Sequence, residues 1–174
     1  MTEAELFKHY EKLYFHEQQR KEQIFSRLNI PLAVIVALLG FYSVIIATDY
    51  KKLEVIAGFT FGFFGAFSAG LLLVGVYFFA DALLGKMDEA PSTPNKLEGW
   101  RRELQVYYAD EPDSELLVAA SIRSAMYADY MNCASLVTIN NDRKASSLYY
   151  CNMALIFATS TALVAYALAK FPSL

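Results

Sequence analysis

The amino-acid sequence predicts an all-α membrane protein with three transmembrane helices and a cytosolic helical bundle. Of its 174 residues, 56% are hydrophobic and only 19% are charged, whereas about a quarter of a typical soluble domain is charged. The charged residues are missing from three long windows, and the remaining segments carry apolar residues at helical spacing. A mean hydropathy of +0.29 excludes a disordered chain and a nucleic-acid-binding tail.

The three uncharged windows are residues 28–48, 55–80 and 145–169. Each is longer than the roughly 20 apolar residues that cross the hydrocarbon of a bilayer. We therefore expect transmembrane helices at about 30–48, 55–79 and 151–169. The first two would form a hairpin within 30–80, and the third, with the C-terminal tail, would occupy 149–174.

Residues 1–29 are expected to form a cytosolic amphipathic helix. Thr2 and Glu5 have the spacing of a capping box, in which each side chain bonds the backbone N–H of the other residue. The residue before a proline avoids the helical conformation. The helix should therefore end or kink near Asn29, ahead of Pro31.

Residues 81–148 are expected to lie in the cytosol as a linker followed by helices. Two prolines among Ser and Thr mark 87–95 as the linker, and Thr93-Pro94 predicts the first turn of a short helix that ends at Tyr108. Residues 113–171 contain neither Gly nor Pro. This absence predicts one long helix, or two helices with a joint near Asn140-Asn141, and the helix would continue into the third span.

The apolar segment 115–142 could also be read as a fourth span. Arg123 and Asp129 interrupt it, and a charge at the centre of a bilayer costs about 2.5–3.5 kcal/mol. We therefore favour a cytosolic helix that packs with the N-terminal helix in the bundle. A fourth span is the alternative.

The distribution of Lys and Arg predicts the orientation. Most of these residues precede the first span or lie between the second and third, whereas Lys51, Lys52 and Lys170 lie on the other side. Cytoplasmic segments carry the excess of Lys and Arg. We expect a cytoplasmic N-terminus and an outside C-terminus, which a fourth span would return to the cytoplasm.

The second span carries small residues about one helical turn apart, which we call the glycine ridge. Small residues at this spacing let transmembrane helices approach closely. The ridge predicts either a face for homo-oligomers or packing against the protein's own spans, and the third span has a weaker row of Ala154, Ala158 and Ala162. The ridge consists of Gly58, Gly62, Gly65, Ala66 and Gly70.

Polar side chains on the third span could line a pore in an oligomer. They are Asn152, Thr159, Ser160 and Thr161. The alternative is hydrogen bonding to other helices or to carbonyls of their own helix. No Asp, Glu, Lys, Arg or His lies within any span, and active transporters depend on such groups. Active transport is therefore not expected.

A stripe of apolar residues on the long helix could dock a cytosolic protein partner. Ile122, Met126, Tyr130 and Val137 follow one another at helical spacing, which usually indicates helix packing within or between molecules. No catalytic pair, metal-ligand set or cofactor motif stands out, because His16 begins a zinc-protease-like pattern whose second histidine is replaced by Arg20. We expect a non-enzymatic protein without metal or cofactor, whose partners are the lipid bilayer, further copies of itself and a cytosolic protein.

The layout resembles the small membrane effectors of bacterial anti-phage systems, in particular the SLATT type. The features that carry the resemblance are a charged N-terminal helix, two close spans and a long Gly/Pro-free helix. The run Asn140-Asn-Asp-Arg-Lys144 before Leu148-Tyr149-Tyr150 is similar to a recurring entry into a last span. The resemblance implies an oligomer of the bacterial inner membrane that perturbs or permeabilises it when a partner senses infection. SLATT proteins usually have two spans, and this chain has a third.

Overall fold

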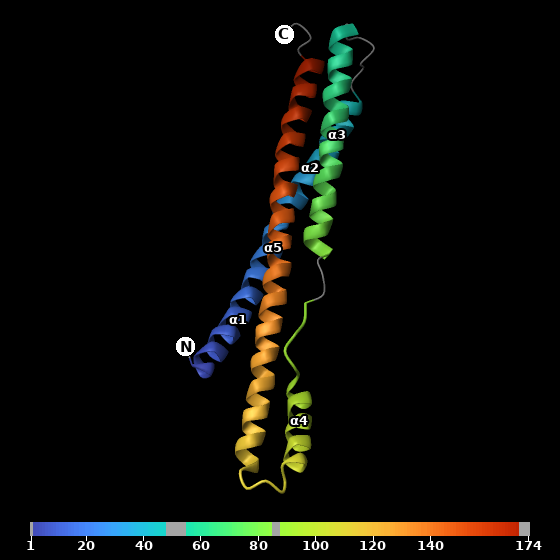
Figure 1. Cartoon of the computed structure of the whole chain (residues 1–174). Helices are drawn as coiled ribbons and strands as arrows, with labels where there is room; N and C mark the ends of the chain where they lie inside the picture. Colours follow the sequence, from blue (N-terminus) through green and yellow to red (C-terminus); the bar gives the residue numbers. More distant parts are fainter. Residues whose placement is uncertain (1, 48–54, 85–87, 171–174) are drawn as a thin grey trace. The chain divides into compact units, whose positions relative to one another are not determined.

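The computed structural model describes residues 2–47, 55–84 and 88–170, and the regular structure of these residues is entirely α-helical (Figure 1). Three helical stretches are long and apolar enough to cross a membrane, as expected. The loop between the first two spans, residue 87 of the linker and the C-terminal tail lie outside the described residues. The helices are α1 (Glu3–Arg27), α2 (Asn29–Ile46), α3 (Val55–Leu84), α4 (Pro94–Tyr107) and α5 (Ser114–Lys170).

The chain divides into two compact units, which are described separately. The charged unit comprises Met1–Glu22 and Lys86–Asn141, and the apolar unit comprises Gln23–Gly85 and Asp142–Leu174. The helices α1 and α5 each contribute to both units. The apolar unit contains the three predicted spans.

The helix boundaries confirm the sequence signals. The backbone N–H of Thr2 donates to the Glu5 carboxylate at 2.7 Å, and the N–H of Glu5 donates to the Thr2 hydroxyl at 3.3 Å, which completes the capping box. The break between α1 and α2 falls at Leu28, because Pro31 has no N–H to bond the preceding turn. Pro94 opens α4 after an extended Thr93.

The long helix α5 is continuous from Ser114 to Lys170 and passes through Asn140-Asn141 without a break. Of the two predicted alternatives, one helix or two, the structure has one. Figure 1 shows it as a single ribbon, with α4 beside its N-terminal part.

The core of the apolar unit is formed where α2 and α3 meet a face of small residues on α5. Leu38 of α2 and Leu72 of α3 pack with Cys151, Ala158 and Ala162, and these three α5 residues are fully buried. The weaker row of the third span therefore packs the spans against one another. Its small side chains bring the helix backbones close, which is what association in lipid requires.

One hydroxyl network links all three helices inside this apolar core. The Ser68 hydroxyl is fully buried and donates to the carbonyl of Ala158 at 2.6 Å. Because its single proton is used there, the Tyr42 hydroxyl is the donor in the contact between Tyr42 and Ser68. The network fixes the register of α2, α3 and α5.

The charged unit is held together by aromatic contacts between α1 and α5. The Tyr130 ring meets Phe7 and Tyr14 with ring centroids 5.6 and 5.8 Å apart, and Tyr10 meets Tyr127 at 5.4 Å. Edge-on aromatic pairs stabilise such contacts by about 0.5–1.5 kcal/mol beyond the area they bury. These contacts provide the packing between the N-terminal helix and the long helix that the sequence predicts.

Gly75 makes a close contact with α5, and this contact predicts the effect of a substitution. A Cβ at this position would lie 3.0 Å from Leu155 Cδ2. Gly75→Leu should therefore destabilise the unit by roughly 1–3 kcal/mol through overpacking. The lowered midpoint would be measured by thermal unfolding in detergent, followed by circular dichroism. Gly40→Leu is the matched control, because a Cβ there meets nothing within 4 Å, and an equal loss in both variants would contradict the packing described.

Candidate functional site

The glycine ridge lies on a side of α3 that the chain's own helices leave open. Gly62, Ala66 and Gly70 are exposed, whereas Gly58 and Gly65 are half-buried. A Cβ built on Gly62, Gly65 or Gly70 would meet nothing within 4 Å. In the described part of the chain these three glycines therefore make no close helix contact.

The hydroxyl groups of the third span bond their own helix. Thr159, Ser160 and Thr161 donate to the carbonyls of Leu155, Ile156 and Phe157 at 2.7–2.9 Å. Their donor hydrogens are thus used within α5, as the second interpretation of this row predicts. Asn152 is exposed on the same helix.

The stripe expected to dock a partner is largely covered within the charged unit. Val137 is fully buried, and Ile122, Met126 and Tyr130 are half-buried. Tyr130 packs against Phe7 of α1. A partner could reach Val137 only after the covering residues move away. The stripe therefore forms packing within the chain, which is the usual meaning of such a pattern.

A polar cluster that the sequence reasoning missed lies in the apolar unit, where the uncharged windows of α3 and α5 end. Asp81 accepts a hydrogen bond from the Ser147 hydroxyl at 2.6 Å and another from the Arg143 guanidinium. We call Asp81, Arg143 and Ser147 the boundary cluster. Asp81 is the first charged residue after the window 55–80, and Arg143 lies just before the window 145–169. The position of two opposite charges at the ends of two uncharged windows is the sequence feature by which the cluster could have been found.

A buried lysine adjoins the boundary cluster on α5. Lys144 is only 4% exposed, and its ammonium lies 5.3 Å from the centre of the Phe25 ring. A cation over an aromatic ring gains about 0.5–2 kcal/mol, more when water is excluded. One turn further along α5, Leu148 packs with Ile24 and Ala82. Buried apolar residues thus lie immediately next to the charges.

The charged unit contains its own buried polar contacts between α1 and α5. Asn141 is fully buried, and its amide donates to the Glu17 carbonyl at 2.8 Å and to the Glu17 carboxylate at 2.9 Å. Lys21 pairs with Asp88 at 2.6 Å, and Asn140 donates to the same carboxylate at 2.8 Å. These bonds fix the register of α1 on α5 and tie the linker to both helices.

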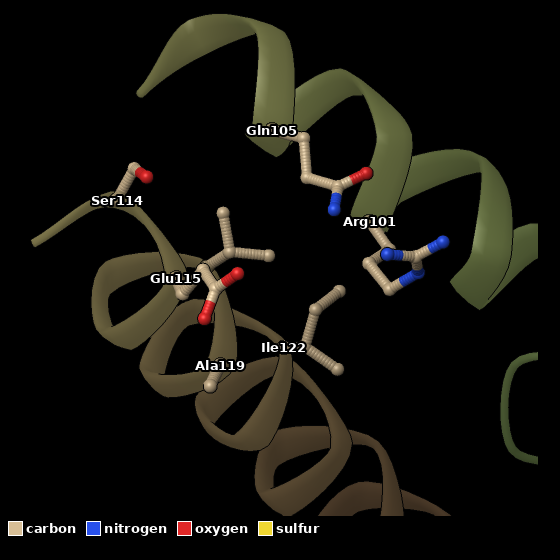
Figure 2. Close-up of a pocket in the computed structure, with 7 residues that line it drawn as sticks. Arg101, Gln105, Ser114, Glu115, Ala119 and Ile122 are labelled. Carbon is tan, nitrogen blue, oxygen red and sulfur yellow. The ribbon is translucent and has the colours of Figure 1, made fainter. Parts of the chain in front are cut away.

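A groove of about 520 Å³ lies between α4 and the start of α5 (Figure 2). Its polar side chains are those of Arg101, Gln105, Ser114 and Glu115, and Val118, Ala119 and Ile122 supply its apolar part. Figure 2 shows the Gln105 and Arg101 side chains on the side of α4 that faces α5.

The hydrogen-bonding fork of Arg101 is already used within α4. The Arg101 guanidinium makes two hydrogen bonds of 2.7 Å to Glu98. Together with Arg102, these bonds lower the pKa of Glu98 to about 2. The carboxylate therefore stays ionised at neutral pH and remains paired with Arg101. Such a groove suits a mixed apolar and polar protein segment better than a free anion.

Among the described residues, no group of three His, Cys, Asp or Glu side chains could hold a metal ion.

Burial of the core of the charged unit can be tested through Cys133, the native cysteine of this unit. Cys133 is 4% exposed, so maleimide should label it slowly in the folded protein and rapidly in SDS, in a Cys151→Ala background. Ser124→Cys, made in a background without native cysteines, is the control because Ser124 is exposed. Mass spectrometry would follow the labelling. Equal rates at positions 133 and 124 would show that this unit is open in solution.

Comparison with known proteins gives no relative from which a function could be transferred. No family model matches the chain, and no curated protein or solved structure matches it. Function is therefore inferred from the contacts, burial and charge described above.

Proposed function

We propose that this chain is an oligomeric protein of the bacterial inner membrane, which permeabilises or perturbs that membrane under the control of a cytosolic partner. This is the role implied by its resemblance to the small membrane effectors of anti-phage systems. The observation that carries the proposal is the open glycine ridge of α3, at which Gly62, Gly65 and Gly70 have no close neighbour. A second copy could approach the α3 backbone there.

The helical phase of α3 supports a separate role for the ridge. Ser68, Leu72 and Gly75 are buried against the other spans. At about 100° per residue, Ala66 and Gly70 lie about 160° around the helix from Ser68. Packing of the three spans within one chain therefore leaves most of the ridge free for contact between chains.

The orientation follows from the basic residues, and we place the N-terminus and residues 81–148 in the cytoplasm and the C-terminus outside. For the segment 115–142, the exposed Arg123 and the hydrogen bond from Asn141 to Glu17 favour a position outside the bilayer over a fourth span. Since α5 continues without a break into the third span, a partner that binds the cytosolic part would bind the same helix that forms this span. Asn152, Thr159, Ser160 and Thr161 remain the proposed lining of any pore.

Assembly through the ridge predicts a change of mass when the ridge is blocked. Gly62→Leu should lower the mass of the detergent-solubilised particle to that of a smaller assembly, because a bulky side chain prevents close approach of the backbones. Gly40→Leu is the matched control, since Gly40 also lies on a span and is also open. Sedimentation velocity would measure both masses. An oligomer that survives Gly62→Leu would exclude the ridge as its interface.

A passive membrane scaffold that recruits a soluble enzyme is the second candidate. The groove between α4 and α5 favours it, since apolar and polar groups there could receive a protein segment.

Membrane integrity separates the two candidates. If the chain is an effector, its expression together with its partner should depolarise the cell, and the purified oligomer with the partner should release dye from vesicles. Gly62→Leu should abolish both effects, whereas Gly40→Leu should preserve them. An intact potential together with co-purification of the partner would instead support the scaffold.

A further inference from the structure

We propose that the boundary cluster holds a phospholipid by its phosphate, in a groove between α3 and α5. The groove has a volume of about 250 Å³ and is lined by Tyr77, Ala80, Asp81, Leu84 and Arg143. It lies wholly within the apolar unit. The proposal depends on the spans being embedded in a membrane and is independent of oligomerisation and of any effector role.

The first argument is the depth of the groove. On α3 the uncharged window ends at Ala80, and on α5 the other window begins at Ala145. The contact between Asp81 and Arg143 brings these two ends to the same level. Charged side chains avoid the hydrocarbon and lie in the headgroup region. The groove therefore opens at the level where lipid phosphates lie.

The second argument is the unused hydrogen-bonding capacity of Arg143. A guanidinium has five N–H donors in a planar fork that fits two phosphate oxygens at once. The Arg143 side chain is 50% exposed, and its bond to Asp81 comes from one terminal nitrogen. The remaining donors can face the groove.

The third argument concerns Asp81, whose carboxylate would otherwise repel a phosphate. One of its oxygens accepts from Arg143 and the other from Ser147, so each oxygen already has a donor and the Arg143 cation offsets the negative charge. Asp81 is thus a positioning residue, because it fixes the guanidinium against α3 while Ser147 fixes the carboxylate.

The surroundings of the groove suit a lipid better than a soluble anion. Tyr77 is 68% exposed and Leu84 is 79% exposed, and tyrosine is enriched where membrane meets water. Leu73, one turn before Tyr77 and also exposed, extends this surface along α3, where an acyl chain could lie. The volume is below that of pockets that enclose whole drug-sized molecules. It therefore fits a headgroup whose acyl chains stay outside.

Native mass spectrometry of the full-length protein, released from nanodiscs of phosphatidylethanolamine and phosphatidylglycerol, would test the proposal. The wild type should retain bound phospholipid, and Arg143→Gln should reduce the retained fraction about tenfold, the effect of one lost charge-assisted hydrogen bond. Arg102→Gln removes an exposed guanidinium of α4 and should leave retention unchanged. Equal retention by wild type and Arg143→Gln would overturn the proposal.

Two further arms keep the result unambiguous. Arg143→Lys keeps the charge beside Asp81 but loses the planar fork, so it should fold and retain lipid at an intermediate level. Retention at the wild-type level would show that charge alone suffices and would contradict a phosphate held by the fork. Excess inorganic phosphate should not displace the lipid, and displacement would indicate a free-anion site. The particle mass in the same spectra reports assembly, so failure of the lipid site and failure of the oligomer are separate outcomes.

Discussion

The face of small residues on α5 is the constraint on which the apolar unit depends. Lipid offers no hydrophobic drive for helices to associate, so contact must come from close packing and from hydrogen bonds between helices. Ala158 and Ala162 allow that packing because their side chains are short, and Ser68 reaches the Ala158 carbonyl only because the backbones are close. Larger side chains at these positions would separate the helices and break the hydroxyl network.

The charged residues around the spans act differently, because they align the ends of the apolar windows of neighbouring helices. Asp81, Arg143 and Lys144 lie where the apolar windows end, and their contacts join α3 to α5 and α5 to the end of α1. In the charged unit the buried bonds from Asn141 to Glu17 set the register of α1 on α5. Polar contacts thus specify the alignment, whereas apolar and aromatic contacts supply most of the packing.

Much of this architecture could be predicted from the sequence because it depends on local signals. The capping box at Thr2, the break before Pro31 and the uninterrupted α5 follow from residue types that act within one or two turns. The partners of each helix face could not be predicted in this way. The stronger small-residue pattern, around Gly62, remains open, and the weaker alanine row of α5 packs the spans. The boundary cluster was missed because charges that flank a span were treated as orientation signals, and only the contact between Asp81 and Arg143 makes them a site.

The regularity of α5 has a consequence for how the gene can vary. Ser147 at the boundary and Ala158 in the core lie on the same helix, and both must face α3 at once. Inserting or deleting one residue between them would turn one relative to the other by about 100°. Exchanges of side chain on the lipid-facing surface of this stretch are tolerable, whereas changes of its length are not, so insertions and deletions should be confined to the connecting segments.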